Sequence, residues 1–249
     1  MQDFVRLKKL HQPMQLNAIQ SMNGTKSCYY PKDKIISFNP EFIWKVNLND
    51  KIKSIHISRS GAVMLNSKWI LNLDFGGNAG LLNTPLSKVL EIKKPVVAPW
   101  SHFWGRYYDF VITLLPKLCK VEKSMGKDIW SQVMVCYPMF NAPYESDFLE
   151  KLGIPKKALV DTRKNKGFVK APSVISSNNN EMFYPFPSDI QILRERFLTK
   201  NGSPGNKRIF ISRKGRRKIV NEYEVVKVLQ EFDFEILEDI SRSVDDQID

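Results

Sequence analysis

A short basic segment near the carboxyl end of the chain, Ser212–Lys218, carries the residue types best suited to bind a phosphate. Arginine side chains match phosphate oxygens two at a time, and Gly215 lets the backbone approach a ligand closely. A diphosphate is therefore the ligand we expect. From spacing alone, a solvated run of surface charges explains the segment at least as well. Nucleic-acid binding is a third interpretation, which is weaker because no aromatic residues interleave with the cations.

The residues on either side of this segment predict that it connects a strand to a helix. Arg208–Ile211 is typical of a buried strand, and Asn221 is expected to cap a helix, with Glu224 reaching back to it. A second strand is expected at Phe234–Leu237, so the three elements predict a βαβ unit with parallel strands. Ligands bind at the carboxyl ends of such strands, where the helix amino end adds unsatisfied N–H groups. The apolar face of the helix is expected at Val225, Val226, Leu229 and Phe232.

The middle of the chain alternates between helical and extended patterns. Apolar residues recur at helical spacing from Tyr107 to Val121, and Pro116 inside that run is expected to kink the helix or split it in two. A short strand at Val133–Cys136 follows, and then a helix from Tyr144 to Leu152 that Gly153 ends. This alternation predicts an α/β fold built from layers of helices and sheet.

The first third of the chain is expected to be rich in strands, before a domain boundary in the second half. Turn-forming residues between Pro172 and Pro187 indicate that boundary, and we expect two domains, residues 1–180 and 181–249. A capping box at Ser188–Gln191 then predicts a helix that runs towards Thr199. The expected early strands are Lys51–Ile57, Gly61–Leu65 and Trp69–Leu73.

The composition favours a basic protein of a reducing compartment. The 38 Lys and Arg residues exceed the 26 Asp and Glu residues, which gives a net charge of +12. An anionic partner follows from this charge: nucleic acid, a membrane surface or a phosphorylated ligand. The chain has three cysteines, Cys28, Cys119 and Cys136, without a Cys-x-x-Cys motif, which argues against a zinc ribbon or a disulfide framework. No apolar run approaches the roughly 18 residues that span a bilayer, so we expect a cytoplasmic protein with at most peripheral membrane contact.

Five short segments occur in an order that one enzyme family shares. From Trp100 to the end of the chain, their order and spacing resemble glycosyltransferase family 61. This family includes bacterial capsular-polysaccharide transferases and eukaryotic xylosyl- and N-acetylglucosaminyltransferases. The five segments are Leu114–Leu118 (Leu-Leu-Pro-Lys-Leu), Lys151–Pro155 (Lys-Leu-Gly-Ile-Pro), Ile211–Arg213 (Ile-Ser-Arg), Arg217–Glu222 (ending in Asn-Glu) and Val244–Ile248 (ending in Gln-Ile).

The resemblance implies an α/β protein of two facing Rossmann-like domains, the GT-B type. The N-terminal, acceptor-side α/β domain would be residues 1–180, and residues 181–249 would be a partial C-terminal domain that binds a nucleotide sugar. The implied activity is inverting transfer of a sugar from a nucleotide-sugar donor, UDP-linked, to a glycan or polysaccharide acceptor. Assembly of cell-surface polysaccharide, such as a capsule, is the implied setting.

The resemblance also assigns roles to four residues of the basic segment and the helix start. Arg213 and Arg217 would hold the donor diphosphate, with Ser212 and Asn221 shaping that pocket. The chain contains no Asp-x-Asp triplet, so we expect neither a metal-chelating donor site nor a further cofactor. Arginines and the helix end would balance the charge of the leaving diphosphate.

The sequence departs from the family pattern at the position where a base is needed. Family members commonly have an aromatic-His pair before the Leu-Pro segment, whereas this chain has Tyr107-Tyr108-Asp109. Inversion requires a base near the acceptor hydroxyl, and a carboxylate can serve. Asp109 is our candidate, with His102 as an assisting group; the alternative is that Asp109 is a surface or helix-end carboxylate.

A second departure concerns the end of the chain. The family's His-Gly-Ala-Gly segment, expected after Ile248, does not follow, and the helix start at Ser243 has too few residues after it for a stable helix. We therefore expect a truncated chain that binds its donor weakly or is inactive. A basic nucleic-acid-binding α/β protein and a catalytically inactive transferase domain remain the alternatives to an active enzyme.

Overall fold

The computed structural model describes most of the chain as two compact units, Met1–Arg196 and Phe197–Asp249. We call them the first and the second unit and describe each by itself. These units are defined by contacts within the chain, and the division between them follows Arg196. The domain boundary that we predicted after residue 180 stays a prediction. The described residues are 5–16, 34–70, 88–99, 106–164, 167–180, 184–198, 207–213, 215, 218–240 and 242–248.

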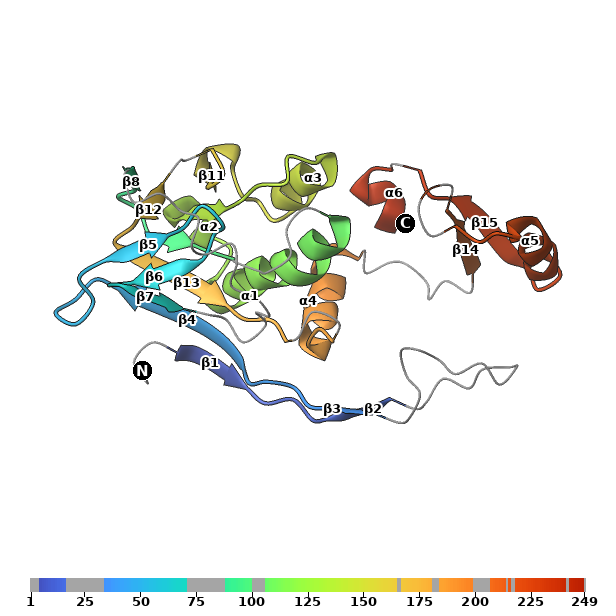
Figure 1. The fold of residues 1–249 in the computed structure, drawn as a ribbon, viewed down its shortest axis with the longest axis horizontal. Coiled ribbons are helices and arrows are strands. Elements are labelled where there is room, and N and C mark those ends of the chain that lie inside the picture. The colour runs from blue at the N-terminus through green and yellow to red at the C-terminus, as the bar shows by residue number, and fades with distance from the viewer. Residues whose placement is uncertain are drawn as a thin grey trace. The chain divides into compact units, whose positions relative to one another are not determined.

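The larger of the two main sheets in the first unit has six strands, in the order β1-β4-β13-β9-β10-β11 (Figure 1). The four strands from β13 to β11 are parallel, and β4 runs antiparallel to both β13 and β1. The prediction of a mixed α/β fold is confirmed. The strands are β1 Val5–Lys9, β4 Glu41–Asn47, β9 Val96–Val97, β10 Met134–Tyr137, β11 Leu159–Asp161 and β13 Ser173–Ser177.

A second sheet of five strands has the order β7-β6-β5-β12-β8, and a separate hairpin pairs β2 with β3. The expected strand at Lys51–Ile57 begins only at Ile55. The Asn49 side-chain carbonyl accepts hydrogen bonds from the Lys51 and Ile52 N–H groups, and this turn replaces the first residues of the expected strand. The strands are β2 Met14–Leu16, β3 Lys34–Ile36, β5 Ile55–Ile57, β6 Val63–Leu65, β7 Lys68–Ile70, β8 Val89–Glu91 and β12 Phe168–Lys170.

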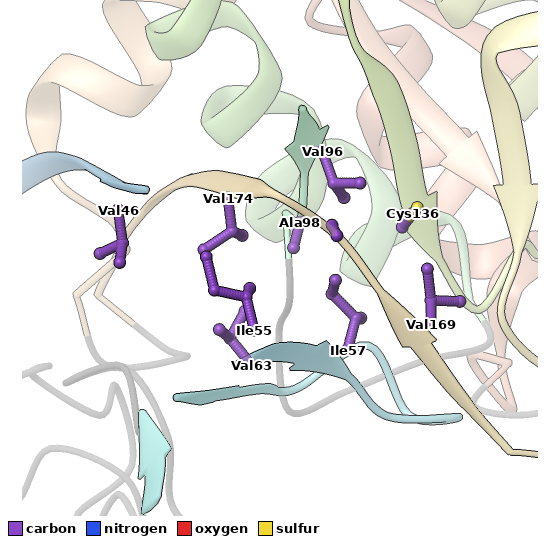
Figure 2. Close-up of a cluster of buried hydrophobic side chains, with 10 residues drawn as sticks. Val46, Ile55, Ile57, Val63, Val96, Ala98, Cys136, Val169 and Val174 are labelled. Carbon is purple, nitrogen blue, oxygen red and sulfur yellow. The ribbon is translucent and has the colours of Figure 1, made fainter. Parts of the chain in front are cut away.

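A hydrophobic core joins the two sheets of the first unit. Figure 2 shows side chains from β4, β9, β10 and β13 of the larger sheet facing those from β5, β6 and β12 of the smaller one. The chain passes from β12 to β13 through Ala171 and Pro172, so one segment contributes to both sheets. Gly167 precedes β12 so close to the Lys88 backbone carbonyl that a side chain cannot fit there. The core residues are Val46, Ile55, Ile57, Val63, Val96, Ala98, Cys136, Val169, Ala171 and Val174.

Helices connect the parallel strands of the larger sheet. The apolar run that contains Pro116 forms one continuous helix: the π-helical turn η2, which ends at Leu114, passes directly into α1, which starts at Leu115. The Leu115 N–H donates to the Phe110 carbonyl oxygen, five residues back, so the hydrogen-bond register changes just before the proline, which has no N–H to donate. The expected split at Pro116 is therefore wrong, and the alternative of a kink there stays a prediction. The helices are η2 Asp109–Leu114, α1 Leu115–Met125, α2 Ile129–Gln132, α3 Pro143–Lys151, η3 Lys156–Ala158 and α4 Pro187–Phe197.

The ends of two of these helices test the capping predictions. Gly153 follows α3 with φ of +75°, and its N–H donates to the Glu150 carbonyl oxygen, so the predicted glycine stop is confirmed. The prediction of a capping box at Ser188–Gln191 is wrong, because α4 already begins at Pro187, so Ser188 lies inside the helix and is not its cap. The Ser188 hydroxyl donates instead to the Glu41 carboxylate on β4, at 2.9 Å.

The second unit is the predicted βαβ unit. β14 (Arg208–Ser212) pairs in parallel with β15 (Phe234–Glu238), and α5 (Glu222–Gln230) connects them. The short helix α6 (Val244–Ile248) follows, and the Ser243 hydroxyl accepts a hydrogen bond from the Asp246 N–H at its start. Among the helices in the described parts of both units, none is long and apolar enough to cross a membrane.

A buried ion cluster, which we call the Lys120 cluster, holds the first unit together at one end of the larger sheet. It consists of Lys120, Glu41, Asp189, His11 and Ser188. The Lys120 ammonium on α1 lies 3.2 Å from a Glu41 carboxylate oxygen and 2.5 Å from one of Asp189 on α4. It also donates to the Asn178 carbonyl oxygen, directly after β13, at 2.8 Å. All three charged side chains are at least 97% buried.

The two carboxylates of the Lys120 cluster differ in their environment. Burial alone would raise the pKa of Glu41, but the Lys120 ammonium and hydrogen bonds from His11 and Ser188 bring it below its usual range. Burial raises the pKa of Asp189 despite the same ammonium, because this carboxyl is enclosed more completely. Both carboxylates depend on Lys120 for their only close positive charge among the described lysines and arginines.

The substitution Lys120→Met should destabilise the first unit by about 3–5 kcal/mol, because it leaves two buried carboxylates without their cation. Lys123→Met, one turn away on α1, is the matched control. Its exposed ion pair with Glu195 should contribute less than about 1 kcal/mol. Urea unfolding followed by circular dichroism measures both variants. Equal stability of the two variants would contradict the stabilising role of the Lys120 cluster.

Candidate functional site

The predicted donor-binding residues Ser212 and Arg213 lie where β14 ends. Ser212 is the last residue of β14, and its carbonyl oxygen accepts a hydrogen bond from the Asp239 N–H, directly after β15, at 2.9 Å. Arg213 follows with an exposed side chain. Gly215 has nothing within 4 Å of the position a Cβ would take, so the loop is open there. The structure therefore places Ser212 and Arg213 at the carboxyl end of parallel strands, where ligands commonly bind.

Arg213 is paired with the carboxylate of the residue that follows the neighbouring strand. Its Nε lies 3.4 Å from an Asp239 carboxylate oxygen, and both side chains are about half exposed. The pair therefore lies at the carboxyl ends of β14 and β15. Arg217 lies outside the described residues, so the predicted meeting of Arg213 and Arg217 at a diphosphate stays a prediction.

Asn221 occupies the predicted cap position of α5 but does not cap it with its side chain. Its carbonyl oxygen accepts hydrogen bonds from the Glu224 and Val225 N–H groups, while its side-chain amide donates to the Glu224 carboxylate at 3.0 Å. Glu222 and Glu224 place negative charge in the first turn of this helix. They stabilise the helix dipole, so the attraction for an anion must come mainly from the loop cations.

In the first unit, the strand order of the larger sheet reverses next to β9. The chain proceeds from β9 through β10 to β11 on one side and then returns to β13 on the other side. The carboxyl ends of β9 and β13 are thus at the position where open α/β sheets commonly bind ligands. The Ser176 hydroxyl connects these two ends by donating to the Ala98 carbonyl oxygen at 2.7 Å.

The segment after β13 is a buried polar edge that sequence reasoning missed. Asn178, Asn179 and Asn180 were expected only to interrupt the periodic pattern, yet all three are buried. The Asn178 side chain accepts from the Phe42 N–H and donates to the Pro40 carbonyl oxygen, which extends the pairing of β13 with β4. Within the described residues, the Ser177 hydroxyl and the Asn179 side-chain oxygen are buried without a hydrogen-bond partner. The sequence signal that could have indicated this buried edge is the run of three asparagines directly after an apolar strand.

Asp109, the predicted base, is the first residue of η2 in the connection that follows β9. It is half-buried. Burial raises its pKa, although a backbone hydrogen bond from Arg106 and the charge of that residue lower it in part. A carboxylate whose pKa is raised is a better proton acceptor than an exposed one. His102, the predicted assisting group, lies outside the described residues.

Two tyrosines, Tyr108 and Tyr144, lie close enough to Asp109 to respond to its charge, and Tyr107 contacts the second of them. Tyr107 and Tyr108 precede it in sequence, and Tyr144, from the first turn of α3, contacts Tyr107 edge to face with ring centroids 5.0 Å apart. Burial raises the pKa of all three phenols. The Asp109 charge raises the pKa of Tyr108 further, and the charges of Glu145 and then Asp109 raise that of Tyr144, so the phenols stay neutral. Tyr107 and Tyr108 are each more than 40% exposed. Asp109 therefore lies at a partly open, aromatic surface, which suits a group that receives a proton from a bound ligand.

The comparison with protein families gives the chain its class. Residues 83–249, more than half of the chain, match the family model described as Glycosyltransferase 61. The chain therefore belongs to glycosyltransferase family 61, as its motifs predicted, and is a glycosyltransferase that acts on a sugar donor and an acceptor. No curated protein matches the chain. Within the described residues, no group of three or more His, Cys, Asp or Glu side chains is arranged to hold a metal ion.

Proposed function

We propose that the protein is an inverting, metal-independent glycosyltransferase of the GT-B type that takes a UDP-linked sugar donor. Arg213 and Arg217 hold the donor diphosphate, Ser212 and Asn221 shape that pocket, and the acceptor is a glycan or polysaccharide such as a capsule. The observation that supports this most is the position of Ser212 and Arg213 at the end of β14, inside the segment that matches the family. The lack of an Asp-x-Asp triplet supports a donor site without a metal or a further cofactor.

In the proposed reaction the acceptor oxygen displaces the diphosphate in one step. The acceptor hydroxyl gives its proton to the Asp109 carboxylate while its oxygen forms a bond to the anomeric carbon of the donor sugar. The bond between that carbon and the diphosphate oxygen breaks, and UDP leaves with the electron pair. Guanidinium groups that already face the diphosphate stabilise the charge that develops on it without having to reorganise.

The free thiols support a reducing location. Cys119 and Cys136 are both buried and unpaired, and burial raises the pKa of each thiol. Buried thiols of this kind are inert and do not require an oxidising compartment. These thiols are compatible with the location we propose, the cytoplasm in peripheral contact with the membrane on which polysaccharide is assembled.

Arg213→Ala and Arg217→Ala should each slow sugar transfer by roughly 30- to 1,000-fold, about 2–4 kcal/mol, the cost of losing one preorganised charge-stabilising donor. Lys207→Ala is the matched control, because Lys207 precedes β14 at its opposite end and pairs with Glu235. Transfer from a panel of UDP-sugars, with UDP affinity measured by calorimetry, tests all three variants.

Undiminished transfer in both arginine variants would contradict the assignment of the diphosphate site. Failure of the intact chain to bind any nucleotide sugar would indicate the inactive transferase domain instead. Tight DNA binding that weakens steeply with salt would indicate the nucleic-acid-binding alternative.

Asp109→Asn should reduce the transfer rate by about 100- to 10,000-fold, the usual contribution of a general base. In the unmodified enzyme, activity should be lost as the pH falls through the pKa of Asp109, since only the ionised carboxylate accepts a proton. That pKa is raised, so the loss should begin at a higher pH than for an exposed aspartate. A pH–rate profile measures it, with Asp147→Asn on α3 as the control. If Asp109→Asn keeps both the rate and the acidic limb, another residue is the base.

A further inference from the structure

A pocket of about 330 Å³ opens between α1, α4 and the start of β4, away from Asp109. Its volume lies at the lower end of the range for small-molecule sites, roughly 300–1,000 Å³. Glu41 and Ile43 belong to the first residues of β4, and Ile43 pairs with Ser177 at the end of β13. The pocket therefore lies beside the same carboxyl end of the sheet as the buried asparagines. Its lining residues are Glu41, Ile43, Lys120, Lys123, Ser124, Ser188, Gln191 and Ile192.

The wall of this pocket includes members of the Lys120 cluster, which are fixed in place. Lys120 and Glu41 are each only 3% exposed, and Lys120 already gives hydrogen bonds or ion pairs to Glu41, Asp189 and Asn178. An ammonium has three N–H donors, so none is left for a ligand. This part of the wall thus offers a ligand a rigid set of polar atoms but no free cationic donor.

The remaining hydrogen-bonding capacity consists mainly of acceptors. The Ser188 hydroxyl donates to Glu41, so its oxygen is left as an acceptor, and a carboxylate oxygen of Glu41 can accept a further bond. Gln191 donates one amide N–H to Glu195 at 2.7 Å, which leaves its carbonyl oxygen and one N–H. A ligand that fits these atoms must bring hydrogen-bond donors.

The charge of the pocket argues against an anionic ligand. Two carboxylates, Glu41 and Asp189, lie with the single Lys120 ammonium, and Lys123 at the rim is paired with Glu195 at 3.1 Å. The pocket therefore lacks an excess of positive charge, although the whole chain carries +12. A phosphate would meet acceptors and carboxylates here, so the guest should be uncharged and rich in hydroxyl groups.

The side chains of Ile43 and Ile192 supply an apolar part of the wall. A sugar ring has hydroxyl groups at its edge and C–H groups on its faces, so it satisfies both the acceptors and the isoleucines. We propose that this pocket binds one neutral pyranose unit of the glycan acceptor, away from the position that reacts. The pocket and its chemistry are independent of the donor site. That the bound pyranose belongs to the acceptor glycan rests on the proposed function.

The test uses the full chain and a panel of methyl pyranosides: glucoside, galactoside, mannoside, xyloside and N-acetylglucosaminide. Saturation-transfer NMR measures their binding. Ser124→Trp places a bulky ring at the rim without touching the buried cluster and should weaken binding about tenfold or more. Gln191→Leu should weaken it about two- to tenfold through the loss of a hydrogen bond. Ser146→Trp, an exposed serine on α3 outside the pocket, is the matched control and should bind as the unmodified chain does.

Saccharide binding that survives Ser124→Trp would overturn the proposal, as would binding of inorganic phosphate or tetramethylammonium at this pocket in place of the pyranosides. UDP binding is measured on the same samples. If Arg213→Ala leaves UDP affinity and transfer unchanged while the pyranosides still respond to Ser124→Trp, the donor assignment fails and the pocket stands. If UDP binding depends on Arg213 but no pyranoside responds to Ser124→Trp, the pocket proposal fails and the donor assignment stands.

Discussion

The buried ammonium of Lys120 is the group on which the arrangement of the first unit depends most. It connects α1, α4, the start of β4 and the end of β13 through two carboxylates and one carbonyl oxygen. Burying three charges is costly unless each has a partner, so these four elements can pack only where Lys120 reaches both carboxylates. A second contact between the same helices, from Arg196 of α4 to Glu122 of α1 at 2.8 Å, follows the same rule.

The Lys120 cluster also affects which parts of the first unit are left for binding and catalysis. The Lys120 cluster closes the carboxyl end of β13 on the side of β4, and it forms part of the wall of the pocket there. The connection after β9 lies at the same carboxyl end of the sheet and leads to Asp109. One end of the sheet thus carries both the candidate base and the candidate sugar pocket, as expected where a parallel strand order reverses.

The sequence predicted those parts of the fold that local chemistry decides. The glycine stop at Gly153 and the βαβ unit around α5 each depend on residues close together in the chain, and both are confirmed. The capping box at Ser188 failed because Glu41, 147 residues away, takes the serine hydroxyl. No local pattern contains that partner.

The Lys120 cluster and the asparagine edge escaped prediction for the same reason. A lysine inside an apolar helical stripe is a signal that it is buried and paired, but its carboxylates come from β4 and α4. The sheet order that brings β4 beside β13 depends on contacts more than 120 residues apart. For the catalytic assignment, the motifs predicted the family, while the roles of Asp109, Arg213 and Arg217 stay predictions.

The charges of the second unit bear on whether its basic loop can serve an anionic donor. Its 10 Lys and Arg residues are balanced by 10 Asp and Glu residues, so the net charge of +12 belongs to the first unit. The second unit as a whole therefore has no net charge to attract nucleic acid, although its loop is basic. Asp239 already pairs with Arg213, but an exposed ion pair contributes only about 0–1 kcal/mol. Under the proposed function, a diphosphate would make two charge-assisted hydrogen bonds to this guanidinium, which are stronger than the exposed pair, so Asp239 would not compete effectively for Arg213.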